Sequence, residues 1–276
     1  MAGRDQSNTT QPERKKESRE VRDLKQQGQS ALIWGLPNPT TEAAVVGVAL
    51  LVRDKLAAKT TPFAAAVATG IAAELLDKTT TKMPAAGSIA CTQGCNYCCY
   101  SVVSVSAPEV FRVVRSIRAN TGATGEAAVL ARARSRKSVS PAMMLAKGMA
   151  CPLLVDGDCS VHQDRPMGCR QYFSASVEAC RLHHEGRLAD PPFIVAAASV
   201  GIIARSVLLG AARSLDLTTD TYELGSALVV ALETPDAERR WLAGEDSLAG
   251  AIKMPQPPNM LSSVERWSGM LKGLTA

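Results

Sequence analysis

Aromatic side chains are scarce in this chain of 276 residues, where they make up only 4% of the sequence. A core with few large rings must be built from smaller side chains, and alanine, leucine and valine on helices supply them naturally. Hydrophobic residues account for 46% of the chain, which is ordinary for a globular protein and excludes bulk disorder. The composition therefore predicts a helical protein with a real hydrophobic core.

A secretory signal is also missing, because no apolar segment follows the polar and charged start of the chain. Residues 1–30 instead carry seven basic and five acidic side chains and almost no apolar ones, which predicts a disordered tail. We therefore expect a cytoplasmic protein. In that compartment cysteines are free thiols or metal ligands rather than disulfides.

Common catalytic and nucleotide-binding motifs are absent as well. The chain has no P-loop, no dinucleotide glycine fingerprint, no Gly-x-Ser-x-Gly and no His-Glu-x-x-His, so no catalytic residue is identified and enzymatic activity stays open. Its formal charge of +5 is not gathered in one basic run with aromatic residues, so we expect no nucleic-acid partner. Residues 193–212 are apolar but contain Arg205, which favours a buried core helix over a membrane span.

Cysteine is what the chain does have, in two groups that include all eight thiols. The two groups are Cys91, Cys95, Cys98 and Cys99 within nine residues, and Cys151, Cys159, Cys169 and Cys180 downstream. All eight are candidate metal ligands, since thiols on tight turns converge in zinc and iron–sulfur sites alike. Adjacent Cys98 and Cys99 cannot easily face one small ion, which indicates a polynuclear cluster or two neighbouring metals. Eight thiols suit two four-coordinate sites, or one four-iron cluster with spare thiols for redox work.

Charged and nitrogen-containing side chains near the second group bear on the choice of metal. Arg165 and Arg170 flank Cys169, and their charge could offset a thiolate cluster, which favours iron–sulfur over zinc; the alternative is solvated loop charge. His162 is either a nitrogen ligand or a loop histidine bonded to backbone. We expect His183 and His184 to lie at the surface near a helix start.

The fold class expected from these patterns is all-α, with a helical domain around an irregular cysteine-rich metal-binding centre. After the tail, we expect a helical hairpin over 31–84, the cysteine-cluster region over 85–187, and a C-terminal helical region over 188–276 that packs with the rest as one domain. Ser106 and Glu109 form a capping box at a helix start. Asp220 and Glu223 have the same spacing, which predicts a second capped helix from Asp220 to Leu232.

The two cysteine groups and their surroundings resemble the CxxCxxCC cysteine-cluster family, the YkgJ-type zinc- or iron-chelating domain. The resemblance covers about residues 88–187, and one departure is His162, where the family usually has tyrosine. The first block that matches is Cys91-x3-Cys95-x2-Cys98-Cys99 with Val103-Ser-Val105-Ser106 and Glu109. The second is Cys151-Pro-Leu-Leu, Gly157-Asp-Cys159-Ser, Arg165-Pro166, Cys169-Arg170-x-Tyr172, Ser174 and Cys180.

This resemblance implies a metal-binding protein, with a 4Fe-4S iron–sulfur cluster or zinc as its cofactor and the eight cysteines as ligands, Cys180 being the weakest match. The similar flagellin lysine N-methylase branch implies an alternative, an S-adenosylmethionine-dependent methyltransferase with a protein substrate. A zinc-stapled interaction module is a further alternative. Cys91-x3-Cys95-x-Tyr97-Cys98 also matches the radical S-adenosylmethionine signature, but the chain lacks the alternating strands and helices of that barrel. Substrate and oligomeric state are not indicated.

Overall fold

The computed structural model of this protein describes residues 17–36, 41–58, 63–83, 88–92 and 94–276. Helices make up 65% of the structure, so the predicted all-α class is confirmed. The α-helices in the described residues are α1 Arg19–Trp34, α2 Thr41–Ala57, α3 Ala64–Lys82, α4 Ala107–Arg134, α5 Pro141–Ala146, α6 Met167–Arg170, α7 Val177–His184, α8 Val195–Ser214, α9 Leu224–Glu233, α10 Ala237–Leu242 and α11 Pro258–Thr275. The shorter elements are the 3-10 turns η2 Tyr97–Tyr100 and η3 His162–Asp164 and the strands β1 Ser104–Ser106, β2 Leu154–Val155, β3 Asp158–Cys159, β4 Thr221–Glu223 and β5 Lys253–Met254.

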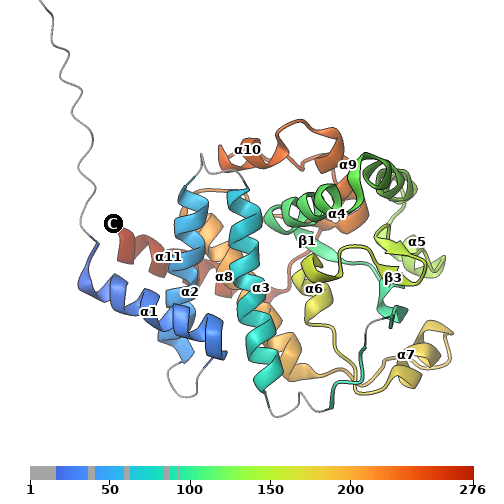
Figure 1. The fold of residues 1–276 in the computed structure, drawn as a ribbon, viewed down its shortest axis with the longest axis horizontal. Coiled ribbons are helices and arrows are strands. Elements are labelled where there is room, and N and C mark those ends of the chain that lie inside the picture. The colour runs from blue at the N-terminus through green and yellow to red at the C-terminus, as the bar shows by residue number, and fades with distance from the viewer. Residues whose placement is uncertain (1–16, 37–40, 59–62, 84–87, 93) are drawn as a thin grey trace, which may run out of the picture.

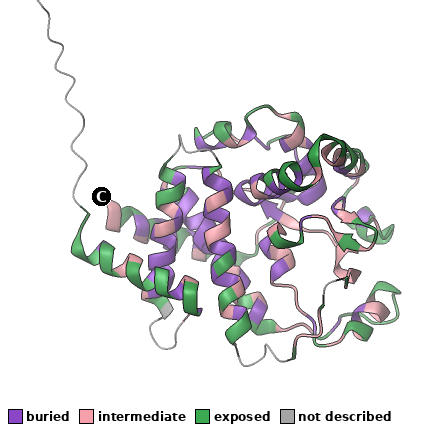
Figure 2. Cartoon of the chain, in the orientation of Figure 1, coloured by how far each residue is buried: buried purple, intermediate pink, exposed green. Residues whose placement is uncertain are grey.

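The main hydrophobic core is a cluster that reaches from α1 to α11. A second, small cluster between α8 and α11 consists of Leu209, Met260 and Val264. Helices α2 and α3 lie side by side and pack against α8, while α4 packs against α3 and α9 (Figure 1). Val48, Leu75 and Leu208 are among the fully buried members of the main core. Buried residues crowd the inner faces of these helices, whereas α7 carries mostly intermediate and exposed residues (Figure 2). The core therefore uses small aliphatic side chains, as the composition indicates.

Helix α8 is the one described helix that is long and apolar enough to cross a membrane. Most of it is buried inside the protein, where it packs against α2, α3 and α11. Arg205, in its middle, donates a 3.2 Å hydrogen bond to the carbonyl of Ser104. This environment is that of a core helix, as expected from the position of the arginine.

The N-terminal region differs from the expected tail. Residues 19–30 belong to α1, so the prediction of disorder over this part is wrong, whereas residues 1–16 lie outside the described residues. Val21, Gly28 and Ala31 form one buried stripe of α1, which packs on α2. A narrow stripe of small residues is enough here because the two helix backbones touch, and a count of apolar residues does not show this contact.

Strands from distant parts of the sequence form a small antiparallel sheet in the order β1-β4-β5. Helix α4 starts directly after β1, and Glu109 accepts hydrogen bonds from the Ser106 amide at 2.9 Å and hydroxyl at 2.7 Å, which confirms the first capping box. The second one is wrong: residues 221–223 form β4, and Glu223 itself caps α9 through the Ser226 amide at 2.7 Å. Pairing of β4 with β1 and β5 excludes helix at this position.

Candidate metal centre

Seven of the eight cysteines line one cavity of about 110 Å³, which brings both cysteine groups together. A single water needs roughly 10–15 Å³ on the same scale, so the cavity has room for several atoms. The lining thiols are Cys91, Cys95, Cys98, Cys99, Cys151, Cys159 and Cys169. Cys180 is buried on α7 outside this lining. A larger hollow of about 1130 Å³ between α4, α9 and α10 contains no cysteine among its lining residues.

The first group is shaped by tight turns. Gly94 has a φ of +84°, a conformation that glycine adopts without strain, and it lets the chain reverse between Cys91 and Cys95. The 3-10 turn η2 follows, and the Cys99 amide donates to the Asn96 carbonyl at 2.8 Å. These turns place the thiols of a short segment around one space.

The second group is carried by a hairpin and a short helix. Asp156 and Gly157 both have positive φ values, 50° and 87°, as a two-residue type I′ hairpin requires. This turn connects β2 to β3 and sets Cys159 opposite Leu154. Cys169 lies on the single turn of α6. The cysteine-rich centre is irregular, as predicted, but within residues 151–187 it also contains this hairpin, η3, α6 and the eight-residue α7.

Direct hydrogen bonds tie the two groups together. The Cys151 amide donates to the Cys99 carbonyl at 2.7 Å. The Asn96 side-chain amide donates to the Gly157 carbonyl at 3.0 Å. The sulfur of Cys91 accepts from the Ser174 amide at 3.4 Å. The thiols of both groups are therefore held by backbone contacts made by the protein alone.

Burial governs the protonation of most of these thiols. It raises the pKa of Cys91, Cys95 and Cys159, and it raises that of Cys151 to about 12. Cys169 has a pKa well above its ordinary value for the same reason. Thiolates are the ligating form, so metal binding at these positions must displace protons.

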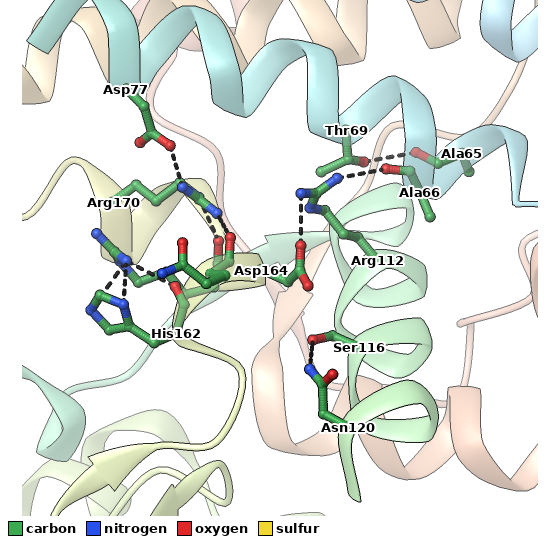
Figure 3. Close-up of polar contacts among 12 residues, drawn as sticks. Ala65, Ala66, Thr69, Asp77, Arg112, Ser116, Asn120, His162, Asp164 and Arg170 are labelled. Atoms are coloured by element: carbon green, nitrogen blue, oxygen red, sulfur yellow. Dashed lines mark hydrogen bonds and ion pairs between the residues drawn. The ribbon is translucent and has the colours of Figure 1, made fainter. Parts of the chain in front are cut away.

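The two flanking arginines do different things. Arg165 lines the cavity, and its positive charge lowers the pKa of Cys98 and opposes the rise at Cys159. Arg170 is buried, donates to Asp77 at 2.5 Å and to the Arg165 carbonyl at 2.9 Å, and is not a lining residue (Figure 3). Arg165 thus matches the electrostatic interpretation. Arg170 instead fastens the segment to α3.

The histidines are also distinguished by position. His162 lines the cavity, and its ring nitrogens lie 3.1 Å and 3.2 Å from an Arg165 nitrogen, as Figure 3 shows. Burial, with the neighbouring arginine, lowers its pKa, so the ring is neutral at pH 7. His183 and His184 lie in the last turn of α7, not at a helix start as predicted. The ring of His184 stacks 4.5 Å from that of Tyr100.

Comparison with known families adds an independent observation. Residues 90–187 match the family CxxCxxCC, which is described as "Putative zinc- or iron-chelating domain". This segment is similar to that domain. The match includes both cysteine groups and confirms the resemblance found from the motifs. No curated protein and no solved structure matches the chain.

The CxxCxxCC match supports metal binding by this cysteine cluster, and soft thiol donors in this number fit a thiophilic metal. Within the described residues, no three Cys, His, Asp or Glu side chains already converge at metal-binding distances. The thiols line one cavity without forming a closed coordination shell.

Several residues of the site carry no cysteine pattern and were missed in the sequence. The Met167 amide, two residues before Cys169, donates to Glu109 at 3.0 Å. Asp164 pairs with Arg112 at 2.7 Å, which links the loop to α4 (Figure 3). These partners are 52 and 58 residues apart in sequence, so no local signal marks them. The capping-box glutamate was visible, but its second role was not.

Proposed function

We propose that the CxxCxxCC segment holds an iron–sulfur centre, with redox chemistry as its use. The observation that carries this proposal is the single cavity lined by seven thiols from two distant stretches of chain. One zinc ion takes four ligands in a structural site, which leaves several of these thiols without a role. A four-iron cluster also takes four cysteine ligands, and the remaining thiols beside it are then available for redox chemistry.

The mutual influence of the thiols supports more than one metal atom. Besides burial, the negative charges of Cys98 and Cys180 raise the pKa of both Cys91 and Cys95. On the other side, Cys98, Cys151 and Cys159 act on Cys169. Cys98 thus acts on Cys91 and Cys95 as well as on Cys169. The pKa of Cys99, the next residue, is raised in part by the charges of Cys151 and Cys169. An arrangement of this kind suits a centre that spans both cysteine groups.

The protein around the cavity supplies charge and excludes water. Arg165 sets a positive charge against the thiolates, which would favour the more negative, reduced form of a cluster. Val103, Leu153 and Leu224 close the cavity with apolar side chains. When bound, an iron–sulfur centre supplies one-electron transfer. Residues of this chain hold it, shield it and adjust its charge.

Zinc binding, a purely structural module and an S-adenosylmethionine-dependent protein lysine methyltransferase are the alternatives. Zinc would occupy the same thiols as a staple of the 151–187 segment. The methyltransferase has no specific contact in the described residues that favours it. We also propose a cytoplasmic location, which all eight cysteines, free in this structure, support.

The test is anaerobic purification of the full chain and of Cys95→Ser. We expect the unaltered protein to contain iron and acid-labile sulfide. Loss of one of the lining thiols should remove most of this metal and open the 151–187 segment to protease. Ser262→Ala, on the exposed face of α11, is the control and should keep both metal and protease resistance.

Two outcomes would contradict the proposal. A colourless protein with stoichiometric zinc would replace the iron–sulfur centre by a zinc site. Metal content and protease resistance of Cys95→Ser equal to those of the Ser262→Ala control would remove the assignment of these thiols as ligands.

A further inference from the structure

A buried ion pair lies next to the chain segment that leads into Cys151. Arg136 and Glu223 are both almost fully buried, and their Nε and Oε1 atoms are 3.1 Å apart. Glu223 also accepts the Ser226 amide and so caps α9. Buried ion pairs carry a large desolvation cost and persist where further hydrogen bonds complete them. The remaining donors of Arg136 therefore matter.

Those donors bind the backbone that precedes Cys151. One Nη of Arg136 donates to the Met149 carbonyl at 2.8 Å and to the Ala150 carbonyl at 3.1 Å. Arg132, one turn earlier, donates to the Pro152 carbonyl at 2.8 Å. Guanidinium groups therefore hold the chain on both sides of Cys151. The thiol lies in the span between these contacts.

The same arrangement occurs at the adjacent strand. Glu109 is buried at the start of α4, accepts the Met167 amide at 3.0 Å, and lies 3.9 Å from the Nε of Arg205. Met167 begins the helix turn that carries Cys169. β1 and β4 pair with Ser104 opposite Glu223, so both carboxylates belong to the same small sheet and its helix starts.

We propose that Arg136, held by Glu223, is a positioning residue that fixes the Cys151 thiol for the metal centre, as Glu109 does for Cys169. This inference rests on the proposed metal-binding function. Each holds the backbone just before a candidate ligand: Arg136 binds the carbonyls of Met149 and Ala150, and Glu109 accepts from the Met167 amide. Space for Arg136 is built in, because a Cβ on Gly225 would lie 2.9 Å from its Cδ.

Arg136→Lys tests the proposal because it keeps the charge opposite Glu223. A lysine ammonium lacks the planar fork that reaches a carboxylate and two carbonyls together. Arg134→Lys is the matched control, since Arg134 is the last residue of α4, two positions before Arg136, is exposed, and pairs with Glu233 at 2.8 Å. Both variants and the unaltered chain are loaded with iron and sulfide under anaerobic conditions. The rate at which a chelator then removes the iron is measured.

We expect Arg136→Lys to release metal about tenfold faster than the control, as is typical when an outer partner of a ligand is removed. Its thiolate-to-metal absorption band should also shift. In the metal-free proteins, hydrogen exchange at the Cys151 amide should be faster than in Arg134→Lys. Release and exchange equal to the control would overturn the proposal.

The two readouts separate this inference from the proposed function. If the unaltered chain binds no metal, the metal function fails, while exchange at Cys151 still decides whether Arg136 holds that backbone. Gly225→Ala serves if Arg136→Lys does not fold, because it leaves both charges and displaces the arginine. The same faster release or exchange is expected of it, and its absence would also overturn the proposal.

Discussion

Cys98 and Cys99 differ in chemistry although they are adjacent and line the same cavity. A hydrogen bond between the two thiols lowers the pKa of Cys98 to about 7 and raises that of Cys99. The positive charge of Arg165 acts in the same direction on Cys98. At neutral pH Cys98 therefore has substantial thiolate character, and the thiolate is the ligating form. Among the thiols with shifted pKa values, Cys98 is the one whose pKa is lowered, toward the thiolate form that binds metal.

The thiols with raised pKa values predict a pH dependence for the metal-free protein. In Cys91, Cys151 and Cys169 the folded state raises the pKa above the unfolded value of about 8.5. A raised thiol pKa contributes stability that is complete below pH 8.5 and is lost as the pH rises. Between pH 8.5 and 10 we expect the free energy of unfolding to fall by about 1.4 kcal/mol per pH unit for each of Cys151 and Cys169, with Cys91 acting in the same direction.

Urea denaturation between pH 7 and 10, with reductant and chelator present, measures this slope. The metal-loaded protein is the control, because its ligating thiols are already deprotonated and its stability should change less over the same window. A metal-free stability that is flat between pH 8.5 and 10 would contradict the burial of these thiols.

At the scale of elements, α1 is held to α2 by direct backbone contact. A Cβ added to Gly47 would lie 1.9 Å from the Leu24 carbonyl oxygen, and one on Gly28 would lie 2.3 Å from the carbonyl carbon of Gly47. Two helices this close leave no room for side chains at the crossing. The polar sequence of α1 is compatible with an ordered helix because only this narrow stripe faces the protein.

Gly47→Ala should therefore separate α1 from α2. We expect a loss of about 1–3 kcal/mol in the free energy of unfolding, as for other overpacked contacts, together with faster proteolysis within residues 17–34. Gly269→Ala, on α11 where the added methyl meets nothing within 4 Å, is the control and should be neutral or slightly stabilising. Equal proteolysis of the two variants would argue against the backbone contact.

At the scale of the whole molecule, two kinds of packing coexist. The helices α2, α3, α4, α8 and α9 share the hydrophobic core. The 151–187 segment is attached by polar contacts instead, such as Arg170 with Asp77 and Arg112 with Asp164 (Figure 3). Few apolar side chains of the segment are fully buried, Leu153, Val161 and Met167 among them. Its order should depend on a bound metal more than that of the core does.

Removal of the metal should thus make the 151–187 segment less ordered and leave the helical core unchanged. After chelation under reducing conditions, we expect faster amide exchange across 151–187, with α2, α3 and α8 still protected. Hydrogen-exchange mass spectrometry of the loaded and stripped protein measures both regions in one experiment. Global unfolding on chelation would show that the core also needs the metal, and unchanged exchange would show that the polar contacts suffice.

Local patterns were enough to predict much of this protein. Apolar spacing indicated the helices of α2, α3, α4 and α8, and the Ser106–Glu109 spacing gave a real capping box, because helix periodicity and caps are properties of a few neighbouring residues. The density of thiols and their tight turns indicated a metal site for the same reason. The cysteine blocks also carried the CxxCxxCC resemblance that the family comparison confirms.

Only the tertiary structure decided which groups meet. Arg165 and Arg170 read alike in the sequence, yet one lines the thiol cavity and the other reaches Asp77, 93 residues away. Position 223 looked like part of a helix cap and is instead a strand end that pairs with buried Arg136. Partners, burial and the order of α1 depend on contacts between distant segments. The sequence by itself determined that the candidate ligands are thiols, and the fold determined which groups surround these thiols.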